Sequence, residues 1–119
     1  MCKPLGLGID LCEISRMEKL LADDRFLSRY FTQQEAEYIR SRGALAAQSM
    51  AGIWAAKEAA LKAMGTGIRF SMKDVEILHD EMGAPVCRLH GAAAGMGGCM
   101  VSITHEGGIA AAVCVLISG

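Results

Sequence analysis

An alanine-rich run from Ala44 to Met64 constrains the fold more than any other part of the sequence. Alanine has the highest helix propensity, the run contains no proline, and Gly52 is its one weak position. We therefore expect a single long helix here. Gly43 breaks it from the preceding sequence, and Gly65 suits the left-handed residue that ends many helices.

Local signals predict the elements that precede this helix. The apolar segment 4–9 predicts a strand that ends at Asp10. A further short helical turn is expected over 26–31. Two capping boxes predict where helices begin: Ser15 with Glu18, before a helix over 16–21, and Thr32 with Glu35, before a helix that reaches Ile39.

The sequence after the long helix is typical of strands. Segments rich in Val and Ile occur at 75–78, 84–89, 99–105 and 109–117. The sequence His-Glu-Gly-Gly between the last two predicts a tight hairpin turn. Helices followed by strands, without strand–helix alternation, predict an α+β fold in which the long helix packs on an antiparallel meander. With 119 residues, the chain is expected to form one domain over 1–119.

The last strand, 109–117, is apolar on both of its faces. An antiparallel sheet usually keeps one face in water, so this strand is expected to be covered on both sides. The long helix accounts for one side. The other is either buried inside the monomer or, as we favour because few helices are available, forms a subunit interface.

Composition excludes several classes of function. A formal net charge of -1 and a pI near 6.3 give no overall attraction to nucleic acids or anionic membranes, so any basic site must be local. No apolar run is long enough to span a bilayer. The chain has five cysteines and no Cys-x-x-Cys pair, which predicts reduced, mostly buried thiols in a cytoplasmic protein rather than a disulfide framework or a zinc site.

Three charged residues lie near the end of the long helix. On a helical wheel, Lys57 falls within an apolar stripe, so its ammonium must reach the edge of the stripe or pair with a fixed anion. The apolar members of this stripe are Met50, Ile53, Trp54, Leu61 and Met64. Glu58 and Lys62 are four residues apart on its flank, which suits an ordinary surface ion pair as well as a functional one.

Other residues near this helix could carry chemistry. Asp10 either caps the next helix, with Glu13 three residues on, or points from a strand end into a cleft. A free Asp10 together with Glu58 would suit Mg²⁺, which takes one or two protein carboxylates. The Gly65–Gly67 turn could expose N–H groups to an oxyanion. His105 is either a core or subunit-edge histidine or a ligand contact.

Three blocks of sequence together resemble a known family. GIDLCEISR (8–16) has the pattern Gly-Ile-Asp with an arginine six residues after the aspartate. WAAKEAALKAMGTG (54–67) matches a central signature of charged residues at fixed offsets, and VSITH (101–105) with IAAAV (109–113) matches a closing hairpin. In this order and at this length, the chain resembles the holo-[acyl-carrier-protein] synthases, the small class of 4′-phosphopantetheinyl transferases.

The resemblance implies an enzyme that transfers 4′-phosphopantetheine from coenzyme A to a serine of apo acyl carrier protein. It also implies Mg²⁺, release of 3′,5′-ADP, a role in fatty acid biosynthesis, and a homotrimer with active sites at subunit interfaces. Asp10 and Glu58 would be metal ligands, and both would act in catalysis with Lys62. The coenzyme A phosphates would be lined by Lys57, Lys62, Gly65, Thr66, Gly67 and His105. The acyl carrier protein would contact Arg16, Lys19, Arg25 and Arg29.

Two other functions would use the same fold. A binding module could hold carrier protein or nucleotide without chemistry, and would not need the pair of carboxylates. A Mg²⁺-dependent phosphohydrolase would use the same metal but exclude a protein nucleophile.

Overall fold

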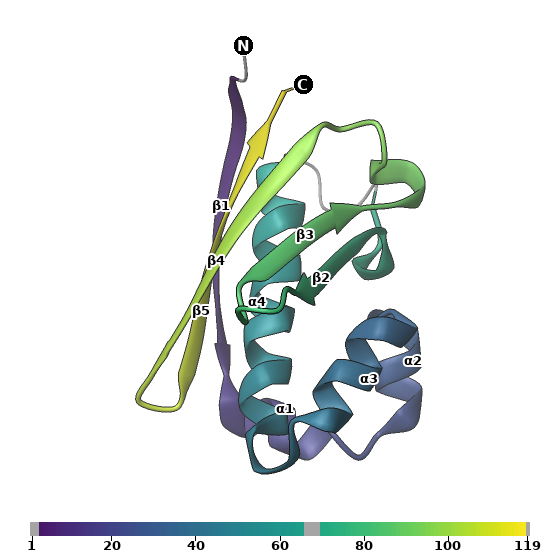
Figure 1. Cartoon of the computed structure of the whole chain (residues 1–119), viewed down its shortest axis with the longest axis vertical. Helices are drawn as coiled ribbons and strands as arrows, with labels where there is room; N and C mark the ends of the chain where they lie inside the picture. The colour runs from purple at the N-terminus through teal and green to yellow at the C-terminus, as the bar shows by residue number, and fades with distance from the viewer. Residues whose placement is uncertain (1–2, 66–69, 119) are drawn as a thin grey trace.

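Helix α4 (Ala46–Ala63) stands at the centre of the fold, and the other elements gather around it (Figure 1). The computed structural model describes residues 3–65 and 70–118. In chain order, the remaining helices and strands are β1 (Pro4–Glu13), α1 (Ile14–Leu20), α2 (Asp24–Tyr30), α3 (Gln33–Ser41), β2 (Val75–His79), β3 (Pro85–Leu89), β4 (Gly98–Glu106) and β5 (Ile109–Ile117). Short 3-10 turns occupy Gly43–Leu45, Met72–Asp74 and Gly91–Ala93. The predicted α+β class is confirmed.

The strands form two antiparallel sheets on different sides of α4. The larger sheet has the order β1-β5-β4, and β2 with β3 forms a separate hairpin. In Figure 1 the larger sheet covers one side of α4, α2, α3 and the β2–β3 hairpin lie on the other, and α1 lies at the lower end of α4. The predicted single meander is therefore wrong. β5 takes the central position because β1, from the far end of the chain, pairs with its second edge.

Of the two predicted capping boxes, the one before α3 forms and the one before α1 does not. Thr32 caps α3 in a capping box with Glu35, as predicted. The Ser15 box does not form, because β1 continues to Glu13 and α1 begins directly after it. The first amide of α1, on Ile14, instead donates to the carbonyl of Gly108 in the β4–β5 turn at 2.9 Å. A contact distant in sequence thus replaces the local cap.

Helix α4 is enclosed on nearly all sides, not along one stripe. Its small residues allow the sheet to approach closely, and a Cβ atom on Gly8 would collide with the carbonyl oxygen of Ala59. At the other end of the helix, a Cβ on Gly52 would meet His105 Nε2 at 3.0 Å. The glycine that weakens the predicted helix is therefore the position where β4 contacts it.

One face of the large sheet is buried against α4, whereas the other is exposed. The inner face of β5 is buried against α4 through Ala110, Ala112, Cys114 and Leu116. On the outer face, large side chains of β1 and β4 remain exposed: Leu5 56%, Leu7 69%, Ile9 65%, Leu11 65% and Met100 62%. We call these five residues, with Val113 and Val115 of β5 between them, the outer sheet face. The prediction that the monomer might bury both sides of β5 is not fulfilled within residues 3–65 and 70–118.

One pair of cysteines is not reduced, contrary to the prediction. Cys87 of β3 and Cys99 of β4 form a disulfide, with Cα atoms 5.8 Å apart, so the expectation of reduced thiols is wrong for them. It is confirmed for Cys12 and Cys114, which are free and buried. Burial raises the pKa of each of these two thiols to about 11, which keeps them protonated. The disulfide links the β2–β3 hairpin to the edge of the large sheet.

Candidate active site

The close approach of β1 to α4 brings Asp10 beside Lys62. On β1, the residues that face α4 are Gly6, Gly8, Asp10 and Cys12, in the alternation expected of a strand. The Lys62 ammonium lies 2.8 Å from Asp10 Oδ1 and 3.1 Å from the carbonyl oxygen of Ile9. Asp10 is not at a strand end and does not cap α1, so the first of its two predicted roles is excluded.

Glu58 shares this site with Asp10. Burial raises the pKa of the Glu58 carboxyl, and the negative charge of Asp10 raises it further. The opposing influences that lower this pKa come from the Trp54 indole N–H, the Arg16 guanidinium and the Lys62 ammonium. The Lys62 pKa is raised, chiefly by its hydrogen bond with Asp10. The two carboxylates repel each other, so a cation bound between them would relieve that repulsion.

The donor set of this site fits a hard divalent cation with few protein ligands. Among residues 3–65 and 70–118, no group of three or more His, Cys, Asp or Glu side chains is placed to hold a metal ion. Asp10 and Glu58 are two neighbouring carboxylates, a donor set compatible with Mg²⁺, which takes one or two protein carboxylates and completes its shell with water and phosphate oxygens.

Lys57 lies elsewhere, and its predicted place at the coenzyme A phosphates is incorrect in this structure. Its side chain is fully buried, and the ammonium lies 2.6 Å from Glu35 Oε1 and 2.6 Å from the carbonyl oxygen of Val75. The alternative prediction, that Lys57 pairs with a fixed anion, is confirmed. The ammonium is occupied by these two acceptors in the core, so it is not available to a ligand at the surface.

The anionic partner of Lys57 is itself held by backbone groups. Glu35 accepts hydrogen bonds from the amides of Thr32 at 2.8 Å and Ile77 at 2.7 Å. The hydroxyl of Thr32 donates to Glu76 at 2.6 Å. This network joins the start of α3, strand β2 and helix α4, and so fixes the helix that carries Glu58.

The predicted phosphate-binding turn is described only at its first residue. Gly65 adopts a φ of 89° directly after α4 and donates its amide to the carbonyl of Lys62 at 3.0 Å. It therefore serves as the glycine that ends the helix, as predicted. Thr66 and Gly67 lie outside the described residues.

His105 lines a separate polar cavity of about 190 Å³ between α4, β4 and the β2–β3 hairpin. His105 Nε2 is 3.1 Å from the carbonyl oxygen of Gln48. Arg42 contributes a cation and donates to Ser49 at 3.2 Å. The other lining residues are Tyr38, Gly52, His79, Gly83, Pro85 and Ile103. The Tyr38 and His79 rings stack 4.2 Å apart, and burial and Arg42 lower the pKa of His79.

One chain does not bring His105 and the Asp10 site into a single cavity. Asp10 is on β1 and His105 on β4, at opposite edges of the sheet with β5 between them. Asp10 contacts Lys62 in the second half of α4, whereas His105 contacts Gln48 near its start. The cavity at His105 contains none of Asp10, Glu58 and Lys62.

The four predicted carrier-protein contacts are exposed on the two short helices. Arg16 and Lys19 lie on α1, and Arg25 and Arg29 on α2. The Arg16 guanidinium also lies 5.5 Å from the centre of the Trp54 ring. Of these four cations, Arg16 is close enough to the site for its charge to lower the pKa of Glu58.

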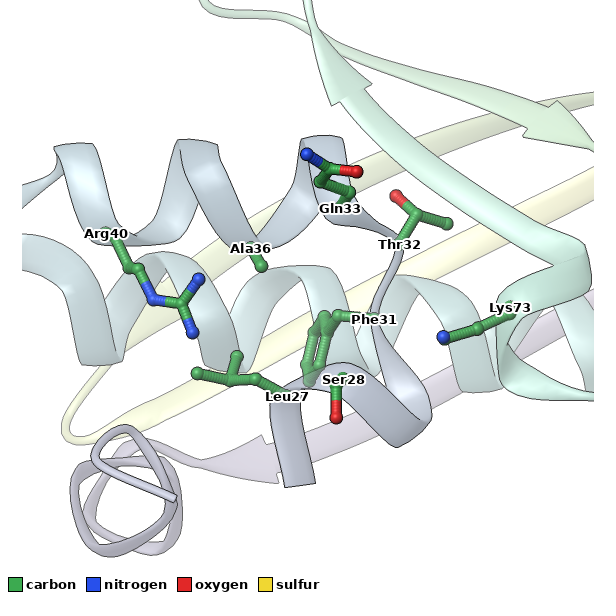
Figure 2. Close-up of a pocket in the computed structure, with 8 residues that line it drawn as sticks. All are labelled: Leu27, Ser28, Phe31, Thr32, Gln33, Ala36, Arg40 and Lys73. Carbon is green, nitrogen blue, oxygen red and sulfur yellow. The ribbon is translucent and has the colours of Figure 1, made fainter. Parts of the chain in front are cut away.

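Figure 2 shows a further cavity, of about 210 Å³, between α2, α3 and Lys73. Leu27 and Phe31 form part of its apolar lining, with Arg40 and Lys73 at opposite ends. It includes none of the predicted site residues.

Two residues of the sites were not predicted from the sequence. Arg42 received no role from the sequence, because nothing local shows that it reaches the same cavity as His105. Trp54 was placed in an apolar stripe, although its i, i+4 spacing from Glu58 could have indicated a polar contact.

Comparison with known proteins identifies the family. A model of the 4′-phosphopantetheinyl transferase superfamily matches residues 6–114. The chain belongs to this superfamily. The family predicted from the three sequence motifs, and with it the assignment as a phosphopantetheinyl transferase enzyme, is confirmed.

Relatives and solved structures cover almost the whole chain. The holo-[acyl-carrier-protein] synthase of Treponema denticola is 44% identical over 97% of this chain and 98% of its own. That of Geobacter sp. is 42% identical, covering 93% of this chain and 96% of its own. The crystal structure of the Bacillus anthracis synthase in complex with CoA (3′,5′-ADP) has a TM-score of 0.83 and 34% identity over 98% of both chains. The Helicobacter pylori synthase in complex with coenzyme A has a TM-score of 0.78 and 30% identity, covering 94% of this chain and 99% of that one.

Proposed function

We propose that this chain, as a single 4′-phosphopantetheinyl transferase domain, transfers 4′-phosphopantetheine from coenzyme A to a serine of apo acyl carrier protein. The products are holo acyl carrier protein and 3′,5′-ADP, and the reaction serves fatty acid biosynthesis in the cytoplasm. The observation that carries the proposal is the grouping of Asp10, Glu58 and Lys62 between β1 and α4 in a chain of this family.

The chemistry requires a hydroxyl oxygen to attack the β-phosphorus of a pyrophosphate diester. Asp10 and Glu58 would hold Mg²⁺, which neutralises charge on the pyrophosphate oxygens when bound. Lys62, exposed beside them, would pair with the phosphate that leaves as part of 3′,5′-ADP. Glu58 is a candidate acceptor for the serine proton, because burial raises the pKa of its carboxyl.

The separation of the two sites supports a homotrimer with active sites between subunits. His105 and Arg42 would bind the nucleotide phosphates of coenzyme A from one subunit, and Asp10, Glu58 and Lys62 would act from its neighbour. The outer sheet face supplies a contiguous apolar surface that a second copy can bury.

Two measurements test this assembly. Sedimentation at micromolar concentration should give a trimer, and Val113→Asp should break the trimer and the activity together, since a buried unpaired carboxylate costs several kcal/mol. A wild-type monomer would exclude the interfacial site.

The cations on α1 and α2 are proposed to dock the acidic carrier protein. Arg16→Glu or Arg25→Glu should raise KM for carrier protein severalfold, because such surfaces act mainly by long-range attraction that salt screens over about 8 Å. KM for coenzyme A should stay close to its wild-type value. Equal changes in both constants, or no effect of salt on the carrier-protein constant, would place docking elsewhere.

One incubation separates the proposed function from its alternatives. The protein is mixed with coenzyme A, Mg²⁺ and apo acyl carrier protein, and the carrier is weighed by mass spectrometry. The proposal predicts that the carrier gains the mass of one phosphopantetheine group. Unchanged carrier with intact coenzyme A would indicate a binding module, and unchanged carrier with cleaved coenzyme A would indicate a hydrolase.

A further inference from the structure

The indole N–H of Trp54 is the most conspicuous polar group that the proposed mechanism does not use. The side chain is only 7% exposed, and Nε1 is buried without a hydrogen-bond partner among residues 3–65 and 70–118. Buried polar groups are nearly always paired, so an unpaired indole N–H requires a functional or structural explanation.

The surroundings of the ring hold it in one position. Three aromatic rings of α2 and the residue that follows it enclose Trp54, with ring centres at 5.3 Å for Phe26, 5.6 Å for Tyr30 and 5.8 Å for Phe31. The Arg16 guanidinium of α1 lies over the ring, 5.5 Å from its centre. The indole cannot turn toward water to satisfy its N–H without breaking these contacts.

The helix places the Glu58 carboxylate one turn after the indole of Trp54. Trp54 and Glu58 are four residues apart on α4, so their side chains lie one above the other on the same side of the helix. The indole N–H lowers the pKa of the Glu58 carboxyl, yet it makes no well-formed hydrogen bond with a described residue. Hydrogen bonds in active sites are often long in the free protein and tighten when a ligand is bound.

We propose that Trp54 is a positioning residue, which uses its indole N–H to hold one oxygen of the Glu58 carboxylate so that the other faces Asp10 across the site. The inference rests on the proposed role of Asp10 and Glu58 as metal ligands. A carboxylate has lone pairs for both a cation and a donor, and a fixed donor on one oxygen selects the rotamer that presents the other. Phenylalanine at this position would preserve the aromatic packing but could not supply the N–H.

The substitution Trp54→Phe tests this role, with Tyr30→Phe as the matched control. Tyr30→Phe removes a hydroxyl from the same aromatic cluster but leaves the indole in place. We expect Trp54→Phe to raise the Mg²⁺ concentration that gives half-maximal transfer by about 10-fold or more, the usual effect of losing a partner of a metal ligand. At saturating Mg²⁺, kcat and KM for coenzyme A should return close to wild-type values, which a general loss of structure would not allow. Tyr30→Phe should leave the Mg²⁺ dependence unchanged.

A second measurement needs neither turnover nor a change at Trp54. This residue is the only tryptophan of the chain, so its fluorescence reports on the indole alone. Mg²⁺ added to the wild-type protein, without coenzyme A or carrier protein, should change the emission with a saturating dependence. The same titration of Glu58→Gln should produce no change.

The outcomes separate this inference from the proposed function. Wild-type Mg²⁺ dependence in Trp54→Phe, or an emission that Mg²⁺ leaves unaffected, would overturn the role of Trp54. If Glu58→Gln is inactive in the same experiments, the metal role of Glu58 stands and only the positioning role is lost. Near-normal transfer by Glu58→Gln would overturn the metal role, and the role of Trp54 with it.

Discussion

Helix α4 carries two lysines five residues apart that have opposite surroundings. Lys57 is fully buried, and its ammonium is held between Glu35 and the carbonyl of Val75. Lys62 has a side chain that is 56% exposed and pairs with Asp10 at the edge of the site. On the same helix, Lys57 therefore forms part of the core and Lys62 forms part of the candidate active site. The difference is set by which elements cover each face of α4.

The largest expected effect is on stability, at Lys57. Lys57→Met leaves the Glu35 carboxyl buried in the core without its cationic partner, which should lower the free energy of unfolding by about 3–5 kcal/mol. Urea denaturation measures this directly. Combining Lys57→Met with Glu35→Gln should destabilise the protein by less than the sum of the two single changes, because the buried charge is removed together with its partner. Strict additivity would show that the two groups do not interact.

The same substitution at Lys62 should lower the activity but leave the stability of the fold unchanged. Lys62→Met removes an exposed side chain, so urea denaturation should give a curve close to that of the wild type. Transfer should fall by about 10- to 100-fold, the effect expected when a charged hydrogen bond to a phosphate is lost. A marked loss of stability with intact transfer would reverse the roles assigned to the two lysines.

A smaller effect, on the pH dependence of stability, should come from Glu76 beside the Lys57 network. Burial alone would raise the pKa of Glu76, but hydrogen bonds from Thr32 at 2.6 Å and with His90 at 2.9 Å outweigh it, and the net pKa is lowered from its usual 4.5. A carboxyl with a lowered pKa in the folded state stabilises the fold above pH 4.5, and this contribution is lost as the pH falls through the folded value. Urea denaturation should therefore show that the free energy of unfolding falls more between pH 6 and pH 3 for the wild type than for Glu76→Gln.

The sequence was sufficient where the signal was local. The capping box of Thr32, the helix-ending Gly65 and the strand over 109–117 each depend on neighbouring residues, and all three are confirmed. These features need no knowledge of what packs against them.

Contacts between distant segments could not be read from the sequence. Lys57 meets Glu35, which is 22 residues away, and Cys87 meets Cys99 across two sheets. The helical wheel showed that Lys57 needed an anion but not which one, and the missed cap at Ser15 was replaced by Gly108 from the far end of the chain. Pairing of this kind depends on topology, which a capping or spacing pattern does not determine.

The central claim is that the exposed side of α4, at Glu58, holds the chemistry. The most direct test measures transfer and unfolding of Glu58→Gln in the same preparation. The ionised Glu58 carboxylate is disfavoured by burial and by Asp10, so the neutral amide should leave the protein at least as stable as the wild type. Mass spectrometry should at the same time find no phosphopantetheine on the carrier protein. A variant that still modifies the carrier at saturating Mg²⁺, or that loses activity only because it unfolds, would contradict the account.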